Sequence, residues 1–113
     1  MNISEVIDWL EDYKQKYPDA TTKFGWTKGG SYRGYYDEFS VEPSESEVDI
    51  DTMVSVLQNA IGQTFCGYKG GEFTMCEETT VYYAPYGHIG PHVTKALLRA
   101  IFEDQDFNYE DYE

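Results

Sequence analysis

The chain has 113 residues, of which 41% are hydrophobic and 17% aromatic, and its 21 acidic and 8 basic residues give a formal net charge of −13. The length suits one domain, and the aromatic content excludes a chain that is disordered by composition. The acidity argues against direct binding of nucleic acid, because phosphates would be repelled. No apolar run approaches the roughly 20 residues of a membrane span, and the N-terminus lacks the basic-then-apolar order of a signal peptide. We therefore expect one cytosolic domain.

The beginning of the chain predicts a helix and two strands. Apolar residues recur every three or four positions over 4–16, which is typical of an amphipathic helix, and Ser4 is its expected N-cap. Segments 21–27 and 31–41 predict antiparallel strands, and 28–30 (Lys-Gly-Gly) predicts the turn between them.

The middle of the chain predicts an irregular strand and a second helix. The aromatic residues of the second strand do not keep one parity, which indicates a bulge at Gly34. After a polar connector, the pattern predicts a helix over 51–61 that Asp49 or Asp51 caps and Gly62 stops.

The second half predicts three strands and a third helix. Segments 64–68 and 72–76 flank a glycine-rich turn, which is typical of a hairpin, and 79–84 is a further β-rich segment. A helix over 91–102 follows, with Pro91 in its first turn.

The expected order of elements is α-β-β-α-β-β-β-α. This order favours an α+β domain over 1–102, with an antiparallel sheet and about three helices on one face. Residues 103–113 hold six acidic residues with aromatic residues between them, so they are expected to form a disordered tail or a short docking segment.

The sequence favours a binding protein over an enzyme. It contains no nucleophile elbow, P-loop, dinucleotide fingerprint or zinc-protease helix. The acidic pairs 37–38 and 77–78 would each present one carboxylate per face of a strand, which is a poor metal site. Cys66 and Cys76 are expected to be free thiols, because their spacing does not suit zinc and the compartment is reducing. No metal and no cofactor are expected.

Two segments stand out from the acidic background: 31–36 (Ser-Tyr-Arg-Gly-Tyr-Tyr) and 67–73 (Gly-Tyr-Lys-Gly-Gly-Glu-Phe). Each places one basic residue among glycines and aromatic rings. Arginine and lysine bind anions, rings stack on bases, and glycine lets a ligand come close to the backbone. The expected ligand-binding residues are Tyr32, Arg33, Tyr35, Tyr36, Lys69, Phe73, Tyr86 and His88.

A purely structural interpretation also remains for these residues. The tyrosines of 31–36 would then cover the helices. His88 and His92 would be a loop residue and a residue at the start of a helix. One of Tyr82 and Tyr83 should face the core and the other should face outward, because neighbours alternate on a strand.

These segments resemble those of a group of small hypothetical proteins encoded by tailed bacteriophages. The resemblance covers about 31–90 and rests on Ser-Tyr-Arg-Gly-x-Tyr at 31–36, Ile-Gly-x-Thr-Phe at 61–65, Gly-Tyr-Lys-Gly-Gly-Glu-Phe-x-Met at 67–75 and Tyr-Gly at 86–87. Pro85 departs from the small polar residue of the group. The resemblance implies a phage protein in the cytoplasm of an infected bacterium, and it implies no particular chemistry.

Two functional hypotheses follow for such an accessory protein that counters host defence. In the first, it sequesters a small anionic, nucleotide-derived signal of host immunity: a ring of Tyr32, Tyr35 or Tyr36 stacks on the base, and Arg33 and Lys69 hold phosphates. In the second, its acidic surface imitates nucleic acid and blocks a host nuclease or defence protein. A homo-oligomer is expected in either case, because an exposed strand edge and a Tyr-rich face favour self-association.

Overall fold

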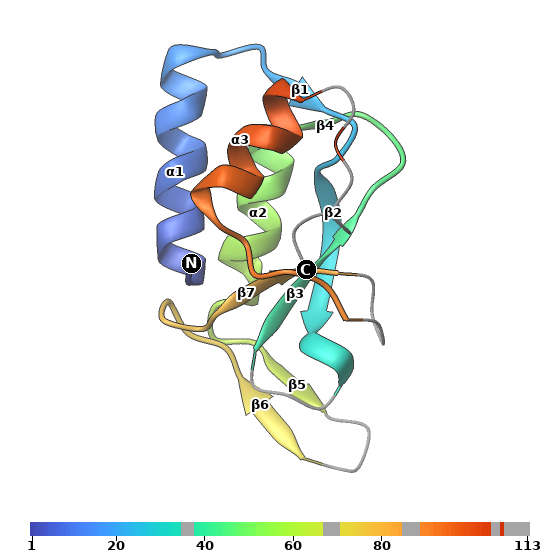
Figure 1. Cartoon of the computed structure of the whole chain (residues 1–113). Coiled ribbons are helices and arrows are strands. Elements are labelled where there is room, and N and C mark those ends of the chain that lie inside the picture. Colours follow the sequence, from blue (N-terminus) through green and yellow to red (C-terminus); the bar gives the residue numbers. More distant parts are fainter. Residues whose placement is uncertain (35–37, 67–70, 85–88, 105–106, 108–113) are drawn as a thin grey trace.

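The computed structural model of the protein describes residues 1–34, 38–66, 71–84, 89–104 and 107. Within these ranges the chain forms the α+β fold that the sequence predicts, with three helices and seven short strands (Figure 1). The helices are α1 (Ile3–Lys16), α2 (Ile50–Ala60) and α3 (Lys95–Glu103). The strands are β1 (Thr21–Thr22), β2 (Trp26–Ser31), β3 (Phe39–Pro43), β4 (Val48–Asp49), β5 (Thr64–Cys66), β6 (Glu72–Thr74) and β7 (Val81–Tyr83), and a 3-10 turn, η1 (Tyr32–Gly34), follows β2. None of these helices is long and apolar enough to cross a membrane.

The strands form three small sheets instead of one. The sheets are β1-β4, β2-β3-β7 and β5-β6. All pairs are antiparallel except β3 and β7, which run parallel with Phe39 opposite Val81. Strand β7 reaches β3 only after α2 and the β5–β6 hairpin, and such a crossover connection permits parallel pairing. The sequence also gave no sign of the two-residue strand β4, whose partner is β1.

The turn between β2 and β3 lies later than the sequence predicts. Gly29 and Gly30 belong to β2, and the chain turns at η1. Glycine is needed at 29 because of close packing: a Cβ atom there would lie 2.5 Å from the ring of Phe39 and 2.7 Å from the carbonyl oxygen of Ser40. The prediction of a turn at 28–30 is therefore wrong. The pairing irregularity lies between Trp26 and Gly29, not at Gly34.

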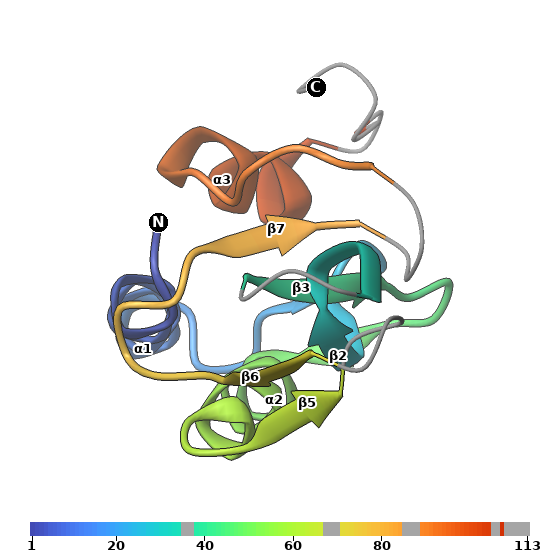
Figure 2. The same ribbon diagram turned by 90° about the horizontal axis from the view of Figure 1, so that it is seen from below.

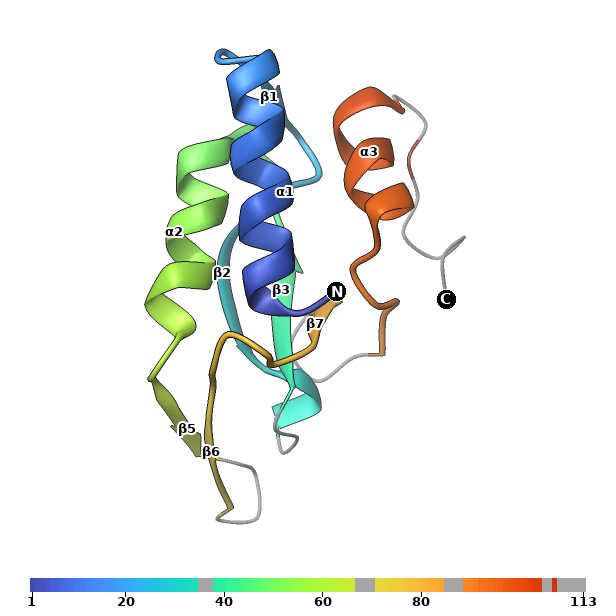
Figure 3. The same ribbon diagram turned by 90° about the vertical axis from the view of Figure 1, so that its left-hand side faces the viewer.

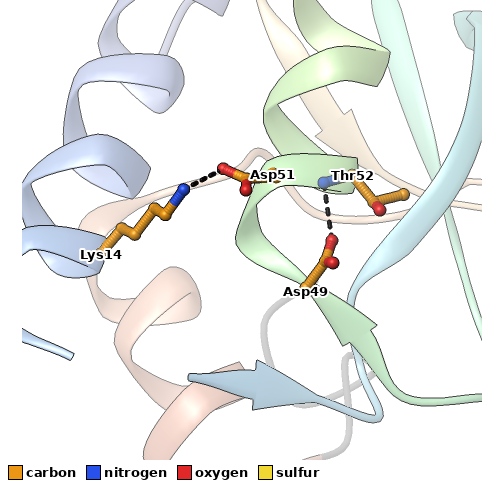
Figure 4. Close-up of polar contacts among 4 residues, drawn as sticks. All are labelled: Lys14, Asp49, Asp51 and Thr52. Atoms are coloured by element: carbon orange, nitrogen blue, oxygen red, sulfur yellow. Dashed lines mark hydrogen bonds and ion pairs between the residues drawn. The ribbon is translucent and has the colours of Figure 1, made fainter. Parts of the chain in front are cut away.

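Side-chain carboxylates and amides cap the first two helices. Asn2, and not Ser4, caps α1: its Oδ1 accepts from the backbone N–H of Glu5 at 2.8 Å, and the Glu5 carboxylate accepts from the Asn2 N–H at 3.0 Å. Asp49 caps α2 by accepting from the Thr52 N–H at 2.8 Å (Figure 4). These bonds satisfy N–H groups that have no partner inside a helix.

Two further details position α2. Asp51, the alternative cap, forms an ion pair with Lys14 of α1 (Figure 4). After Ala60 the chain leaves the helix, and Gly62 has φ +82°, the left-handed conformation expected of a residue that stops a helix.

The third helix begins at Lys95, later than the predicted Pro91. Thr94 is its N-cap and accepts from the Leu97 N–H at 3.1 Å. Residues 91–93 instead lie along β7: the Tyr83 N–H donates to the Pro91 carbonyl and the Val93 N–H to the Val81 carbonyl, both at 2.9 Å. This backbone pairing outweighs the local preference of proline for a first helical turn.

The helices and the central sheet enclose one core. Figure 2 shows α3 next to β7 and α2 next to β2, with α1 between the two helices, and Figure 3 shows α1 beside both. Trp26 is fully buried and its indole N–H donates to the Met53 carbonyl at 3.0 Å. Phe107 is also buried, with its ring 5.1 Å from that of Phe24 and 5.8 Å from that of Tyr83. Packing therefore extends beyond residue 102.

Replacing Asp49 by alanine should lower the free energy of unfolding by about 1 kcal/mol, because the N-cap bond to Thr52 is lost. A hydrogen bond from the Thr52 side chain, followed by this bond from its backbone N–H, also lowers the pKa of the Asp49 carboxyl. A carboxyl group whose pKa is lower in the folded state stabilises the fold fully at pH values above its ordinary pKa. This stabilisation is lost as the pH falls through the lowered pKa of the folded state. Urea denaturation should show the wild type and Asp49→Ala converging in that acidic range. The exposed Glu45→Ala is the control, with an expected change within about 0.5 kcal/mol; equal losses in both variants would contradict the cap.

Candidate functional site

Arg33 lies in a tight turn at one end of the central sheet. The turn η1 joins β2 to the segment before β3, and the Tyr32 N–H donates to the Glu38 carbonyl at 2.6 Å across it (Figure 1). Arg33 has φ 55° and ψ 15°, and within the described part of the chain no other residue except glycine has a positive φ. For residues other than glycine this left-handed conformation costs free energy. The turn is therefore strained, and the structure around it must stabilise it.

Tyr32 is buried, and its ring forms a stack that anchors this turn. Its ring lies 3.8 Å from that of Tyr82, with only 9° between the two planes, and Tyr32 is 8% exposed. The Gly90 N–H approaches the Tyr32 hydroxyl at 3.4 Å. The prediction that Tyr32 contacts a ligand stays a prediction, and so little exposure leaves only part of the ring for such a contact.

Strand alternation produces the second half of the stack. Tyr83 is buried in the core and its hydroxyl donates to the Phe24 carbonyl at 2.5 Å, whereas Tyr82 points to the other face of β7 and is partly exposed. The sequence predicted this division without deciding which tyrosine would face outward. The core partners of β7 decide it, because Val81 and Tyr83 share one face.

A short polar chain runs from His92 through Tyr82 to Glu38. His92 Nε2 lies 2.7 Å from the Tyr82 hydroxyl, and the two rings are 4.4 Å apart. Burial, a hydrogen bond to the Glu38 side chain and the charge of that carboxylate raise the pKa of Tyr82. The phenol therefore stays neutral at physiological pH. The arrangement suits positioning of the turn better than proton transfer.

The predicted site residues are only partly placed. Tyr35, Tyr36, Lys69, Tyr86 and His88 lie outside the described residues.

The residues that flank segment 85–88 do lie near the stack. The Ala84 N–H donates to the Val41 carbonyl at 3.0 Å, and its carbonyl accepts from Ser40 Oγ at 2.6 Å. Gly90 contacts Tyr32, as described above. A Cβ atom on Gly90 would lie 2.2 Å from the Tyr83 carbonyl oxygen, so only glycine fits so close to β7. Before this segment Ala84 is therefore held against β3, and after it Gly90 lies beside Tyr32.

Phe73 has a packing partner of its own. It lies opposite Phe65 in the antiparallel β5–β6 hairpin, and the Phe65 ring is 6.0 Å from that of Phe39 in β3. Figure 1 shows this hairpin and η1 at the same end of the molecule. Phe73 therefore connects the hairpin to the core while remaining partly exposed.

The cysteines do not face one another across this hairpin. Cys66 lies opposite Glu72, and Cys76 follows the end of β6. Both are free and exposed. Among the residues that the structure describes, no three histidine, cysteine or acidic side chains gather as a metal site requires.

Sequence reasoning did not assign Glu38, Tyr82 and His92 to this site. The sequence shows that these three residues are polar or titratable, but each also fits an ordinary structural role equally well, so the sequence does not single them out. Only the pairing of β7 with β3 and with residues 91–93 brings the three together.

Comparison of the chain with protein-family models, with curated proteins and with solved structures finds no match.

Replacing Arg33 by glycine should leave a more stable protein than replacing it by alanine, by about 1 kcal/mol. Both variants lack the guanidinium group, and only glycine accepts φ 55° without strain. Chemical denaturation of the two variants measures the difference. At Thr27, an exposed position in β2, the order should reverse, with alanine the more stable. Equal stability of the two Arg33 variants would show that the left-handed turn does not persist in solution.

Proposed function

We propose that this protein binds a small anionic ligand, nucleotide-like in its chemistry, at the end of the molecule formed by η1 and the β5–β6 hairpin. The observation that carries the proposal is Arg33, a cation held in a strained turn by the Tyr32–Tyr82 stack. Strained conformations persist where the surroundings enforce them, and such places are often functional. A cation whose backbone is fixed in this way loses less conformational entropy when it binds an anion.

Other residues that the sequence singles out would extend this proposed site. Lys69 would supply a second cation, and Tyr35, Tyr36, Phe73, Tyr86 and His88 would supply rings and donors around the ligand. Glycines on both sides of Lys69 would allow close approach of phosphate groups. The strongly negative remainder of the surface would give selectivity, because an anion is held only where a local cation outweighs the overall charge.

The proposed activity is sequestration without catalysis. The groups of the stack that could move a proton are bonded to one another, and the raised pKa of Tyr82 makes it a poor acid at neutral pH. In the setting that the phage resemblance implies, the ligand would be a nucleotide-derived signal of host immunity, and the protein would act in the cytoplasm of an infected bacterium.

Arg33→Ala should weaken ligand binding by about ten- to a hundredfold, since a charged hydrogen bond contributes roughly 1.5–3 kcal/mol. Native mass spectrometry of protein purified from defence-active bacteria should reveal a bound small molecule on the wild type. The bound fraction should fall for Arg33→Ala and Lys69→Ala. The exposed cation Lys95 on α3 provides the control variant, Lys95→Ala.

Thermal melts of the same variants separate binding from folding. Arg33→Ala should melt close to the wild type while losing ligand. A large fall in melting temperature would mean that Arg33 acts in the fold, and wild-type ligand retention by Arg33→Ala would end the proposal.

A second candidate function rests on the outer face of α1. Glu5, Asp8 and Asp12 lie three and four residues apart on this helix and carry no ion pair in the described structure, and all three are exposed. At about 1.5 Å of rise per residue, successive carboxylates are roughly 4.5–6 Å apart along the axis. This spacing is of the same order as the ~3.4 Å between phosphates along one DNA strand. The face would therefore suit the basic groove of a host nuclease or defence protein.

Removing negative charge from this face and from the C-terminal end of the chain should weaken protein inhibition and leave ligand capture unchanged. Asp8→Asn combined with deletion of 108–113 removes negative charge but keeps the buried Phe107. In a host-nuclease inhibition assay, the loss should be most visible at raised salt, where the remaining charges are screened. Arg33→Ala serves as the opposite control. If the deletion abolishes activity and Arg33→Ala does nothing, the acidic surface is the functional one.

A further inference from the structure

A groove between α1 and α3 lies apart from the proposed ligand site. Its volume is about 470 Å³, and one wall is lined by three aromatic side chains: Trp9 and Tyr13 of α1, and Tyr17, the residue that caps the end of this helix. They stand four residues apart and so share one helix face. The Trp9 and Tyr13 rings stack at 5.1 Å, and the ring of Phe102 from α3 packs 4.7 Å from that of Tyr13. Tyr17 is 52% exposed, which is unusual for a large ring in a packed row.

Four charged side chains complete the groove, two of each sign. Asp12 and Lys16 come from α1, and Arg99 and Glu103 come from α3. In both helices the two opposite charges are four residues apart, a spacing that allows an ion pair. All four side chains are exposed, and the described structure gives none of them an ion pair. Burial, followed by the charge of Glu103 and by Tyr17, raises the pKa of Tyr13.

The charge balance decides which partner this groove suits. The whole chain carries −13, whereas these four side chains sum to zero. A small anion would meet Asp12 and Glu103, and a small cation would meet Lys16 and Arg99. A partner that has the same mixture of charges around a row of aromatic rings can place each of its charges opposite one of the other sign, so it avoids this repulsion. A two-fold symmetric contact presents such a surface to itself.

We propose that the groove between α1 and α3 is the contact surface of a homodimer. Two α1 helices that pack antiparallel about a two-fold axis level with residue 14 place Asp12 of each copy opposite Lys16 of the other. The exposed ring of Tyr17 is then covered by the second copy. The contact brings the two acidic molecules together at a surface where they do not repel one another, and it leaves η1 and the β5–β6 hairpin at the far end of β2 and β3 open (Figure 1).

Charge reversal tests this proposal directly. One variant combines Lys16→Glu with Arg99→Glu, and the other combines Asp12→Lys with Glu103→Lys. Each variant alone has a groove of one sign and should be a monomer of about 13.0 kDa by sedimentation velocity. An equimolar mixture should form a dimer of twice that mass, because the two grooves are now complementary. The wild type should be a dimer under the same conditions, at about 0.15 M salt where the overall charge is screened beyond about 8 Å.

Two controls keep the result interpretable. Glu45→Lys combined with Glu77→Lys changes the net charge as much as the positive variant does, at exposed positions outside the groove, and should remain a dimer. Recovery of the dimer on mixing also excludes misfolding, because an unfolded variant would not be rescued by its counterpart. Tyr17→Ala should raise the dimer dissociation constant by at least about tenfold, a change that analytical ultracentrifugation resolves.

Three outcomes would overturn the proposal. The first is a wild type that remains monomeric at about 100 µM, since dimers with dissociation constants up to that order would be populated. The second is a dimer that survives both charge reversals, which would place the contact elsewhere. The third is a mixture of the two variants that stays monomeric.

Discussion

Strand β7 pairs in parallel with β3, and the alternation of its side chains reaches both the core and the candidate site. Tyr83 enters the core and bonds to the Phe24 carbonyl, whereas Tyr82 emerges on the opposite face and stacks on Tyr32. Residues 91–93 pair with the other edge of β7 and bring His92 to the Tyr82 hydroxyl. A one-residue slip of this pairing would exchange the two tyrosines and remove the stack and the core contact together.

The stack explains how the chain maintains a conformation that Arg33 alone would not adopt. The left-handed turn costs of order 1 kcal/mol, and the packed rings of Tyr32 and Tyr82, with the bond from the Tyr32 N–H to the Glu38 carbonyl, offset that cost. A fixed turn is useful where a cation must be presented in one geometry.

The charge of −13 has different consequences in different parts of the surface. The outer face of α1 carries a row of carboxylates, whereas Arg33 in η1 is a local cation in an otherwise acidic chain. In the groove of Trp9, Tyr13 and Tyr17 the negative charge is balanced by Lys16 and Arg99. The ligand site near η1 is separate from the other two surfaces, whereas the acidic face and the groove both lie on α1 and share Asp12. A basic protein and a second copy of the chain would therefore compete for that helix.

The sequence by itself determined the α+β class, the existence of the three helices, the β5–β6 hairpin and the left-handed stop at Gly62, because each depends on periodicity or turn chemistry within a few residues. It also singled out Arg33 as a cation beside glycine. Only the tertiary structure decided that Gly29 lies in a strand under the Phe39 ring, that Pro91 precedes an extended segment, and that Tyr82 joins Tyr32. These features depend on contacts between residues far apart in the chain. Local propensities do not determine which distant strand or ring a segment will pack against.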